Sequence, residues 1–335
     1  MKTEKKIFKN IIASTAGKIS GDLAAFIFLI YFAREFGASY FGQYAFAMSL
    51  GGFLSILVSL GLNKLVIREI SKDKSLNKKY MSNMLATQGA LVIISWSLIA
   101  IIVLLSSFDN TSKLIILIIG AYQVLYKYSQ LIQAQFDAHE DMEYSAFLEI
   151  FHKIVILLLG SVSIVIWNDP VVTLLAYPIS ALSMFVIGLK ISFSKYERLD
   201  FSINIPFIKE LLTKALPFLI LLVLAQFYDR IGIIILTAVH GDEATGIYAA
   251  ADRLIITIVI GLGLFGGALF PVMSRFAKDS PQKLIVTYRR AVRIIVVTIL
   301  PFSTFLYLLG EQIILLLFGE VFIKSADVLM IMSWA

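Results

Sequence analysis

The chain has 335 residues, of which 59% are hydrophobic and 16% are charged, whereas soluble domains are roughly 45–50% apolar and about 25% charged. A water-soluble fold of this size could not bury so much apolar surface. The absence of cysteine excludes disulfides, thiolate zinc sites and iron–sulfur clusters. The net charge of +6 does not predict a nucleic-acid partner, because the basic residues lie between hydrophobic segments rather than on one polar face.

Apolar segments of about 20 residues, long enough to cross the hydrocarbon core as helices, follow one another along the chain. Helices satisfy their own backbone hydrogen bonds inside a bilayer. The sequence therefore predicts an all-α, polytopic transmembrane bundle of about ten helices. The tenth ends in mid-pattern, so we expect the native chain to continue. The predicted spans lie near 11–34, 43–67, 83–105, 114–136, 145–167, 170–193, 214–238, 246–274, 291–309 and 322–335.

The connecting segments alternate between those rich in Lys and Arg and those with few. Because cytoplasmic loops retain Lys and Arg, this alternation predicts a cytoplasmic N-terminus and a multi-pass protein of the cell (inner or plasma) membrane. The acidic segment 137–144 is the exception on the cytoplasmic side. The basic segments are the leader before residue 11, 68–80, 190–214 and 275–293, whereas the opposite loops contribute Arg34, Lys113 and Lys324.

An internal repeat is suggested by short matches at nearly constant spacing. Asp22 and Asp229 are each followed by an apolar run and then by Gly-x-Tyr-Ala-x-Ala, which begins at Gly42 in one copy and at Gly246 in the other. Because six helices separate the copies, both start on the same side and form parallel repeats. The predicted lobes are 1–200, with helices one to six, and 201–335, with helices seven to ten of an incomplete second lobe.

Several ionisable residues fall inside the predicted spans. A charge at the centre of a membrane helix costs about 2.5–3.5 kcal/mol, so each requires a partner or a hydrated cavity. In one interpretation these residues line a cationic cavity that receives an anionic headgroup. In the other, neighbours such as Lys18 and Asp22 are neutralised pairs that hold helices together. Lys127 has no carboxylate within a helical turn, which favours the cavity at that position.

The cavity interpretation gives a definite set of candidate residues. Glu149, His152 and Lys153 are left out of it, because they lie near the start of the fifth predicted helix, where long side chains can reach the interface. The three histidines lack metal-ligand spacing, so no metal or cofactor is expected. The candidates for substrate binding are Lys18, Lys127, Arg230, Arg253, Gln123 and Gln130, and those for a coupling ion are Asp22 and Asp229.

Four stretches carry a family resemblance: the leader with the mid-membrane Asp22, REFGASYFGQYAFAMSL, FPVMSRFAKD and LFGEVFIKSADVLMIMSWA. They resemble the polysaccharide-exporter branch of the multidrug/oligosaccharidyl-lipid/polysaccharide (MOP) flippase superfamily, of the O-antigen flippase type. The resemblance implies two lobes with twelve or more helices in all, a pyrophosphate contact by cavity Lys and Arg, and ion coupling in some relatives. The implied substrate is an undecaprenyl-pyrophosphate-linked oligosaccharide, moved from the inner to the outer leaflet.

Two other functions are weighed against a flippase. A drug/cation antiporter of the same superfamily would be expected to have an acidic cavity, and the cationic candidates here count against it. A membrane glycosyltransferase or polysaccharide polymerase needs a sizeable extramembrane loop, and the outer loops SSFDNTSK, WNDP and HGDEAT are too short. We therefore expect a transporter rather than an enzyme, whose partners are the bilayer, the lipid-linked substrate and the polysaccharide assembly machinery.

Overall fold

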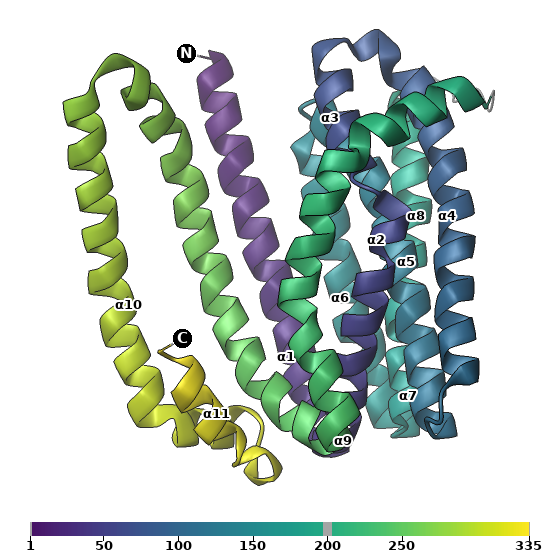
Figure 1. Ribbon diagram of the computed structural model, residues 1–335, viewed down its shortest axis with the longest axis vertical. Coiled ribbons are helices and arrows are strands. Elements are labelled where there is room, and N and C mark those ends of the chain that lie inside the picture. Colours follow the sequence, from purple (N-terminus) through teal and green to yellow (C-terminus); the bar gives the residue numbers. More distant parts are fainter. Residues whose placement is uncertain (1, 197–202, 335) are drawn as a thin grey trace. The chain divides into compact units, whose positions relative to one another are not determined.

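The computed structural model describes residues 2–196 and 203–334, with side chains from Ser20 onward apart from some between 258 and 279. Every regular element in that part of the chain is helical, which confirms the predicted all-α membrane bundle (Figure 1). Besides two short 3-10 turns, the helices are α1 (Lys2–Leu54), α2 (Ile56–Ser59), α3 (Leu62–Lys72), α4 (Asn77–Leu105), α5 (Asn110–Ala138), α6 (Met142–Trp167), α7 (Pro170–Leu174), α8 (Ala176–Lys195), α9 (Ile205–Asp279), α10 (Pro281–Leu317) and α11 (Ser325–Met332).

The breaks predicted between spans at 35–42 and 239–245 are confirmed, because α1 and α9 each join two helices across a kink, with no longer loop between them. Each kink lies at one glycine. Gly37 has φ 78° and ψ −176°, and Gly241 has φ 80° and ψ −176°. Only glycine adopts this backbone conformation readily. The two kinks are the same number of residues apart as Gly42 and Gly246, so the structure repeats the spacing seen in the sequence.

The second predicted span, 43–67, is not one helix. It is divided among the end of α1, the short α2 and α3, and the break falls at Leu60 and Gly61, with φ 43° and 77°. A Cβ atom at Gly61 would lie 2.7 Å from Cβ of Phe218 in α9. The glycine therefore serves both the left-handed turn and the close approach of α9.

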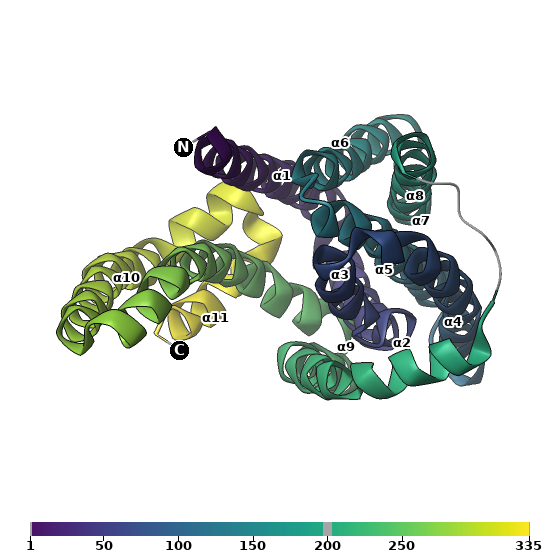
Figure 2. The same cartoon turned by 90° about the horizontal axis from the view of Figure 1, so that it is seen from above.

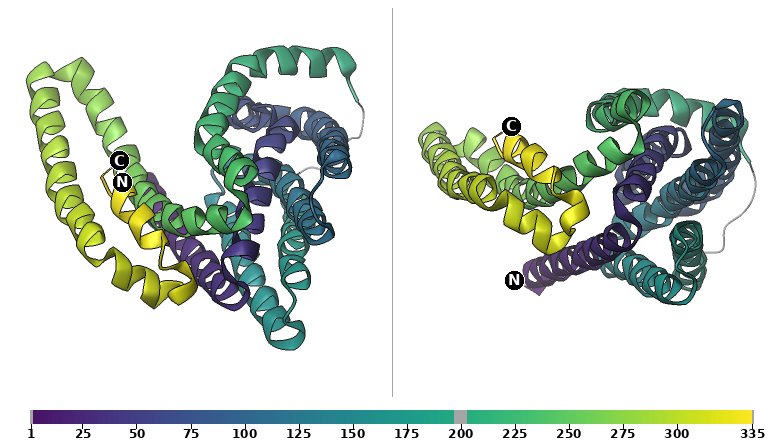
Figure 3. Two further views of the ribbon diagram at one scale, coloured as in Figure 1. Left: turned by 60° about the horizontal axis from the view of Figure 1, so that its bottom comes forward. Right: turned by 90° about the horizontal axis from the view of Figure 1, so that it is seen from below.

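Contacts between residues divide the chain into two compact units, called unit 1 (1–36 and 43–241) and unit 2 (37–42 and 242–335). In unit 1, α5 is the central helix and contacts α2, α3, α4, α6, α7 and α8 (Figure 2). In unit 2, the second half of α9 and α10 form an antiparallel hairpin, and α11 packs on α10 (Figures 1 and 3). The predicted lobe boundary at residue 200 lies outside the described residues.

Within unit 2, the two copies of the glycine motif cross at their backbones. A Cβ atom at Gly42 would collide with the carbonyl of Asp242, and one at Gly246 would collide with the carbonyl of Ala38. The contact is reciprocal, because Ala38 precedes Gly42 by four residues just as Asp242 precedes Gly246. Small residues four apart allow helices in a membrane to approach this closely. The two copies of the glycine motif therefore also pack against each other.

The outward faces of the helices are apolar, as a bilayer requires. Within residues 2–196 and 203–334, seven helical segments are long and apolar enough to span a membrane. The number is smaller than ten because α1 and α9 each count once and α11 is short. Large exposed side chains include Leu105 on α4, Val165 on α6 and Leu316 on α10, which are 74–83% exposed. Such surfaces are stable only against lipid or another protein.

Candidate functional site

The charged candidate Asp22 on α1 is paired with a residue of α6. Nζ of Lys153 lies 2.7 Å from Oδ1 of Asp22 and 3.1 Å from Oε1 of Glu149, one turn earlier on α6. A Cβ atom at Gly21 would lie 2.9 Å from Cδ of Lys153, so the lysine stem crosses α1 where a side chain is absent. The interpretation of Glu149 and Lys153 as interfacial residues is wrong, since their side chains are only 12% and 15% exposed.

Glu149 is held by two more hydrogen bonds from α5. The hydroxyl of Tyr126 donates to Oε1 at 2.9 Å, and the amide of Gln133 donates to Oε2 at 3.2 Å. A carboxylate inside a membrane protein requires such partners, because no water replaces its lost hydration. We call Asp22, Lys153 and Glu149 the acidic cluster, because two carboxylates share one ammonium and one negative charge is left over when all three are ionised.

His152, also interpreted from the sequence as interfacial, is instead buried between aromatic rings of α5. Its ring stacks on those of Tyr122 and Tyr126, with centroids 5.6 and 5.1 Å away. The hydroxyl of Tyr122 lies 3.3 Å from Nε2 of His152. Tyr122 also meets the ring of Tyr177 on α8, whose hydroxyl bonds that of Tyr44 on α1 at 2.8 Å. This aromatic layer fixes α1, α5, α6 and α8 around the acidic cluster.

The three binding candidates on α5, Gln123, Lys127 and Gln130, have two different roles in the structure. The amide of Gln123 donates to the carbonyl of Met48 on α1 at 3.2 Å and therefore joins two helices. Nζ of Lys127, which is half-buried, donates to Oε1 of Gln130 at 3.2 Å. Within the described part of the chain, no carboxylate lies within ion-pair distance of Lys127. Among those residues, Lys127 is therefore a cation on the central helix of unit 1 without a counter-ion.

The other candidates lie on α9 or outside the described side chains. Asp229 is exposed and Arg230 is half-buried, and no ion pair joins these two described neighbours. In unit 2, Nε of Arg253 is buried without a hydrogen-bond partner among the described residues. The side chain of Lys18 lies outside the described part, so the predicted pair with Asp22 stays a prediction. In the structure, Lys127 therefore donates a hydrogen bond to Gln130, and Lys153 forms an ion pair with Asp22.

A family model described as "Polysaccharide biosynthesis protein" matches residues 7–277, which is most of the chain. The chain belongs to this family. It is a multi-pass membrane protein, as the sequence predicts. No curated protein matches its sequence.

Solved structures of a flippase and of multidrug transporters show the same fold. The chain is similar to the lipid II flippase MurJ in an inward closed conformation, at 15% identity and TM-score 0.73, over 98% of this chain and 72% of MurJ. It is similar to the MATE multidrug transporter DinF-BH, at 14% identity and TM-score 0.68, over 97% of this chain and 77% of that one. An inward-facing multidrug resistance MATE transporter matches at 19% identity and TM-score 0.61, over 94% and 76%. At these identities the likeness shows the fold alone.

Proposed function

We propose that this protein transports lipid-linked oligosaccharides, carried on undecaprenyl pyrophosphate, from the cytoplasmic to the outer leaflet of the cell membrane. The family is one of polysaccharide biosynthesis, and the fold is shared with a flippase for a lipid-linked precursor, lipid II. The product would enter cell-surface polysaccharide assembly, so the partners are the substrate, the bilayer and that assembly machinery. The O-antigen type of repeat unit is part of this proposal.

The observation that carries the proposal is the charge of Lys127, which has no ion-pair partner in the described part of the chain. A lysine in a membrane-spanning helix is costly unless an anion or water compensates it. Its described partner, Gln130, is neutral, so the ammonium can accept a further anionic group. A diphosphate supplies such a charge, and charge-assisted hydrogen bonds are the strong ones. A cationic drug would instead be repelled from this position.

In the proposed mechanism, the lobes 1–200 and 201–335 rock against each other in alternating access. Lys127 in the first lobe and Arg253 in the second bind the diphosphate, with Lys18 and Arg230 as further basic contacts and Gln123 and Gln130 as hydrogen-bonding groups. The polyprenyl tail stays in the bilayer while the headgroup crosses. Transporters built from parallel repeats move in this way around a site near the midplane.

The acidic cluster supports ion coupling at Asp22. Its excess negative charge can be neutralised by one proton or one monovalent cation. Asp22 is 44% exposed and Glu149 only 12%, so an ion would reach Asp22 first and affect Glu149 through Lys153. Moving one charge across 100 mV is worth about 2.3 kcal/mol, enough to bias a transport cycle. Asp229, exposed on α9, is the second coupling candidate.

Replacing Lys127 by alanine is the test of this function. In proteoliposomes containing the full-length protein and a labelled undecaprenyl-pyrophosphate oligosaccharide, Lys127→Ala should slow headgroup translocation roughly 10- to 100-fold, the worth of one hydrogen bond to a charged group. Lys127→Arg should retain most activity, and Lys113→Ala, at the other end of α5, should have no effect. Wild-type rates in Lys127→Ala would remove this residue from the mechanism. Wild-type transport of organic cations instead of the lipid would favour the antiporter.

A further inference from the structure

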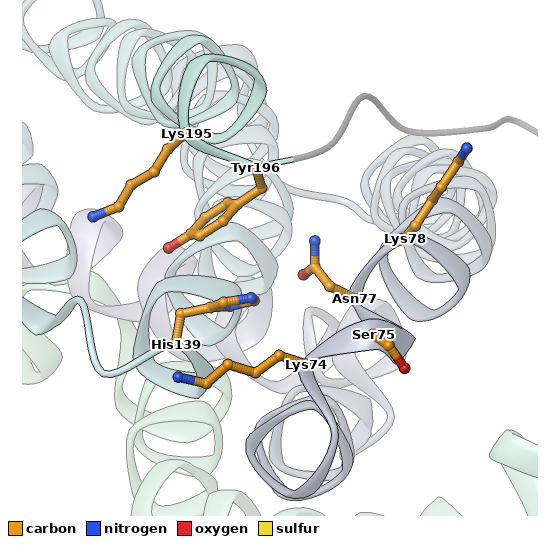
Figure 4. Close-up of a pocket in the computed structure, with 7 residues that line it drawn as sticks. All are labelled: Lys74, Ser75, Asn77, Lys78, His139, Lys195 and Tyr196. Atoms are coloured by element: carbon orange, nitrogen blue, oxygen red, sulfur yellow. The ribbon is translucent and has the colours of Figure 1, made fainter.

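A second basic site lies in unit 1, at the end of the bundle where α4 begins and α5 and α8 end. It is a pocket of about 260 Å³ lined by Lys74, Asn77, Lys78, His139 and Tyr196, among others (Figure 4). Ligand sites for drug-sized molecules occupy roughly 300–1,000 Å³. The pocket therefore suits a small polar group rather than an oligosaccharide, and none of the transport candidates lines it.

The buried amide of Asn77 points into this pocket with a fixed orientation. Its side chain accepts a hydrogen bond at Oδ1 from Nε2 of Gln135 at 3.0 Å, and Oε1 of Gln135 accepts one from the hydroxyl of Ser192 at 2.6 Å. This chain of bonds occupies Oδ1 and leaves the NH₂ group of Asn77, a lining residue, for the pocket. Asn77 is only 6% exposed, and its NH₂ group has no partner among the described residues. This donor is accessible from the pocket, which Asn77 lines, and is therefore available to a ligand.

The charged groups around the amide are of two kinds. Lys74 and Lys78 line the rim of the pocket, are exposed, and form no ion pair among the described residues, and Figure 4 shows the ammonium of Lys78 pointing away from Asn77. Lys195 and Tyr196 instead bind Asp141. Nζ of Lys195 lies 2.8 Å from Oδ1 of Asp141, and the hydroxyl of Tyr196 donates to Oδ2 at 2.7 Å. Burial alone would raise the pKa of Asp141, but the bonds from Lys195 and Tyr196 outweigh it and hold the pKa below its usual value. In the described part of the chain, the two flexible lysines at the rim of the pocket thus keep ammonium groups free of ion pairs.

His139 adds one more polar group to the wall. Its Nδ1 lies 2.9 Å from the carbonyl of Gln135, so Nδ1 donates and Nε2 is left for another partner. The ring of Tyr196 packs on that of His139, with centroids 4.3 Å apart, and closes one side. The NH₂ group of Asn77 in the pocket, with the flexible side chains of Lys74 and Lys78 at its rim, suits an anion with several acceptor oxygens.

The pocket also lies at the depth of the lipid headgroups. Three candidate membrane spans begin or end at its lining: Lys74–Leu105 begins there, Asn110–Ala138 ends one residue before His139, and Pro170–Lys195 ends within it. We propose that this pocket binds a phosphate group, either the phosphodiester of an anionic phospholipid or free phosphate. Anionic lipids of the cytoplasmic leaflet attract basic segments with about 1 kcal/mol per Lys or Arg.

Binding is tested with the purified full-length protein in detergent, by the thermal midpoint in titrations with short-chain phosphatidylglycerol, short-chain phosphatidylcholine or inorganic phosphate. Two variants alter the pocket. Lys74→Gln with Lys78→Gln removes its free charges without touching the core. Asn77→Asp keeps the acceptor for Gln135 but replaces the inward NH₂ group by a negative oxygen. The matched control is Lys64→Gln with Lys209→Gln, which removes two exposed charges elsewhere.

Saturable stabilisation by phosphatidylglycerol, weakened at least about tenfold in both pocket variants and unchanged in the control, would support the site. Equal stabilisation by inorganic phosphate would identify free phosphate as the ligand, and its absence would identify the lipid. The proposal is overturned if wild-type protein shows no saturable response to either, or if phosphatidylcholine stabilises equally. Equal weakening in the control would reduce the effect to general surface charge and would also overturn it.

Discussion

Replacing Lys153 by methionine is expected to lower the free energy of unfolding by about 3–5 kcal/mol, the usual cost of removing one partner from a buried ion pair. Methionine fills a similar volume but leaves the carboxylates of Asp22 and Glu149 without their shared cation. Most of the cost falls on Glu149, because Asp22 is 44% exposed and water screens it. The measurement is the thermal unfolding of the full-length protein in detergent.

Two comparisons separate this effect from a loss of packing. Lys195→Met removes an ion pair to Asp141 that is more exposed, at 31% and 23%, and should cost at most about 1 kcal/mol. Adding Asp22→Asn and Glu149→Gln to Lys153→Met should recover most of the loss, because the uncompensated charges disappear. If the triple variant is as unstable as the single one, the lysine stem rather than the charge is responsible, and the acidic cluster loses its electrostatic role.

Gly42→Ala is expected to lower the free energy of unfolding by about 1–3 kcal/mol, the range for inserting a group into a packed interior. The added methyl group would collide with the carbonyl of Asp242 and approach N of Gly246 within 2.8 Å. Both obstacles are backbone, so two helices have to separate. Gly246→Ala should cost about the same, because its methyl group would meet the carbonyl of Ala38 in the reciprocal position.

The matched control is Gly232→Ala in the helical interior of α9, where a Cβ atom would meet nothing within 4 Å. Alanine should be tolerated there or stabilise by up to about 1 kcal/mol, since glycine is a poor helix former. Thermal unfolding of the three variants gives the comparison. Equal stability of Gly42→Ala and Gly232→Ala would contradict the close crossing of the two repeat copies.

The fold class follows from local properties of the sequence, and for that reason it was predictable. The length of the apolar segments, together with a composition unlike that of a soluble domain, suffices to predict an all-α membrane bundle. The repeat was visible because backbone crossings require glycine, so Gly42 and Gly246 recur in a recognisable motif. The breaks inside α1 and α9 were predictable but their form was not, since a glycine such as Gly37 serves equally well in a loop or a kink.

The pairing of Asp22 was missed because sequence spacing shows only neighbours on the same helix. Lys18 is one turn away, whereas Lys153 is 131 residues away on α6. A position near a predicted helix start also suggested that Lys153 reaches the interface, but α6 begins at Met142 and places Lys153 about three turns inside. The pocket at Asn77 depends on a series of side-chain hydrogen bonds through Gln135 and Ser192, and no local pattern predicts it.

The central claim is that Lys127 remains charged inside the membrane because water and an anionic headgroup reach it. The chain contains no cysteine, so Lys127→Cys introduces a single thiol on the central helix of unit 1. In full-length protein reconstituted in vesicles, a membrane-impermeant thiol reagent should label this cysteine, and the lipid-linked substrate should slow the labelling. A cysteine that is protected from the reagent on both sides of the membrane, with and without substrate, would contradict the account.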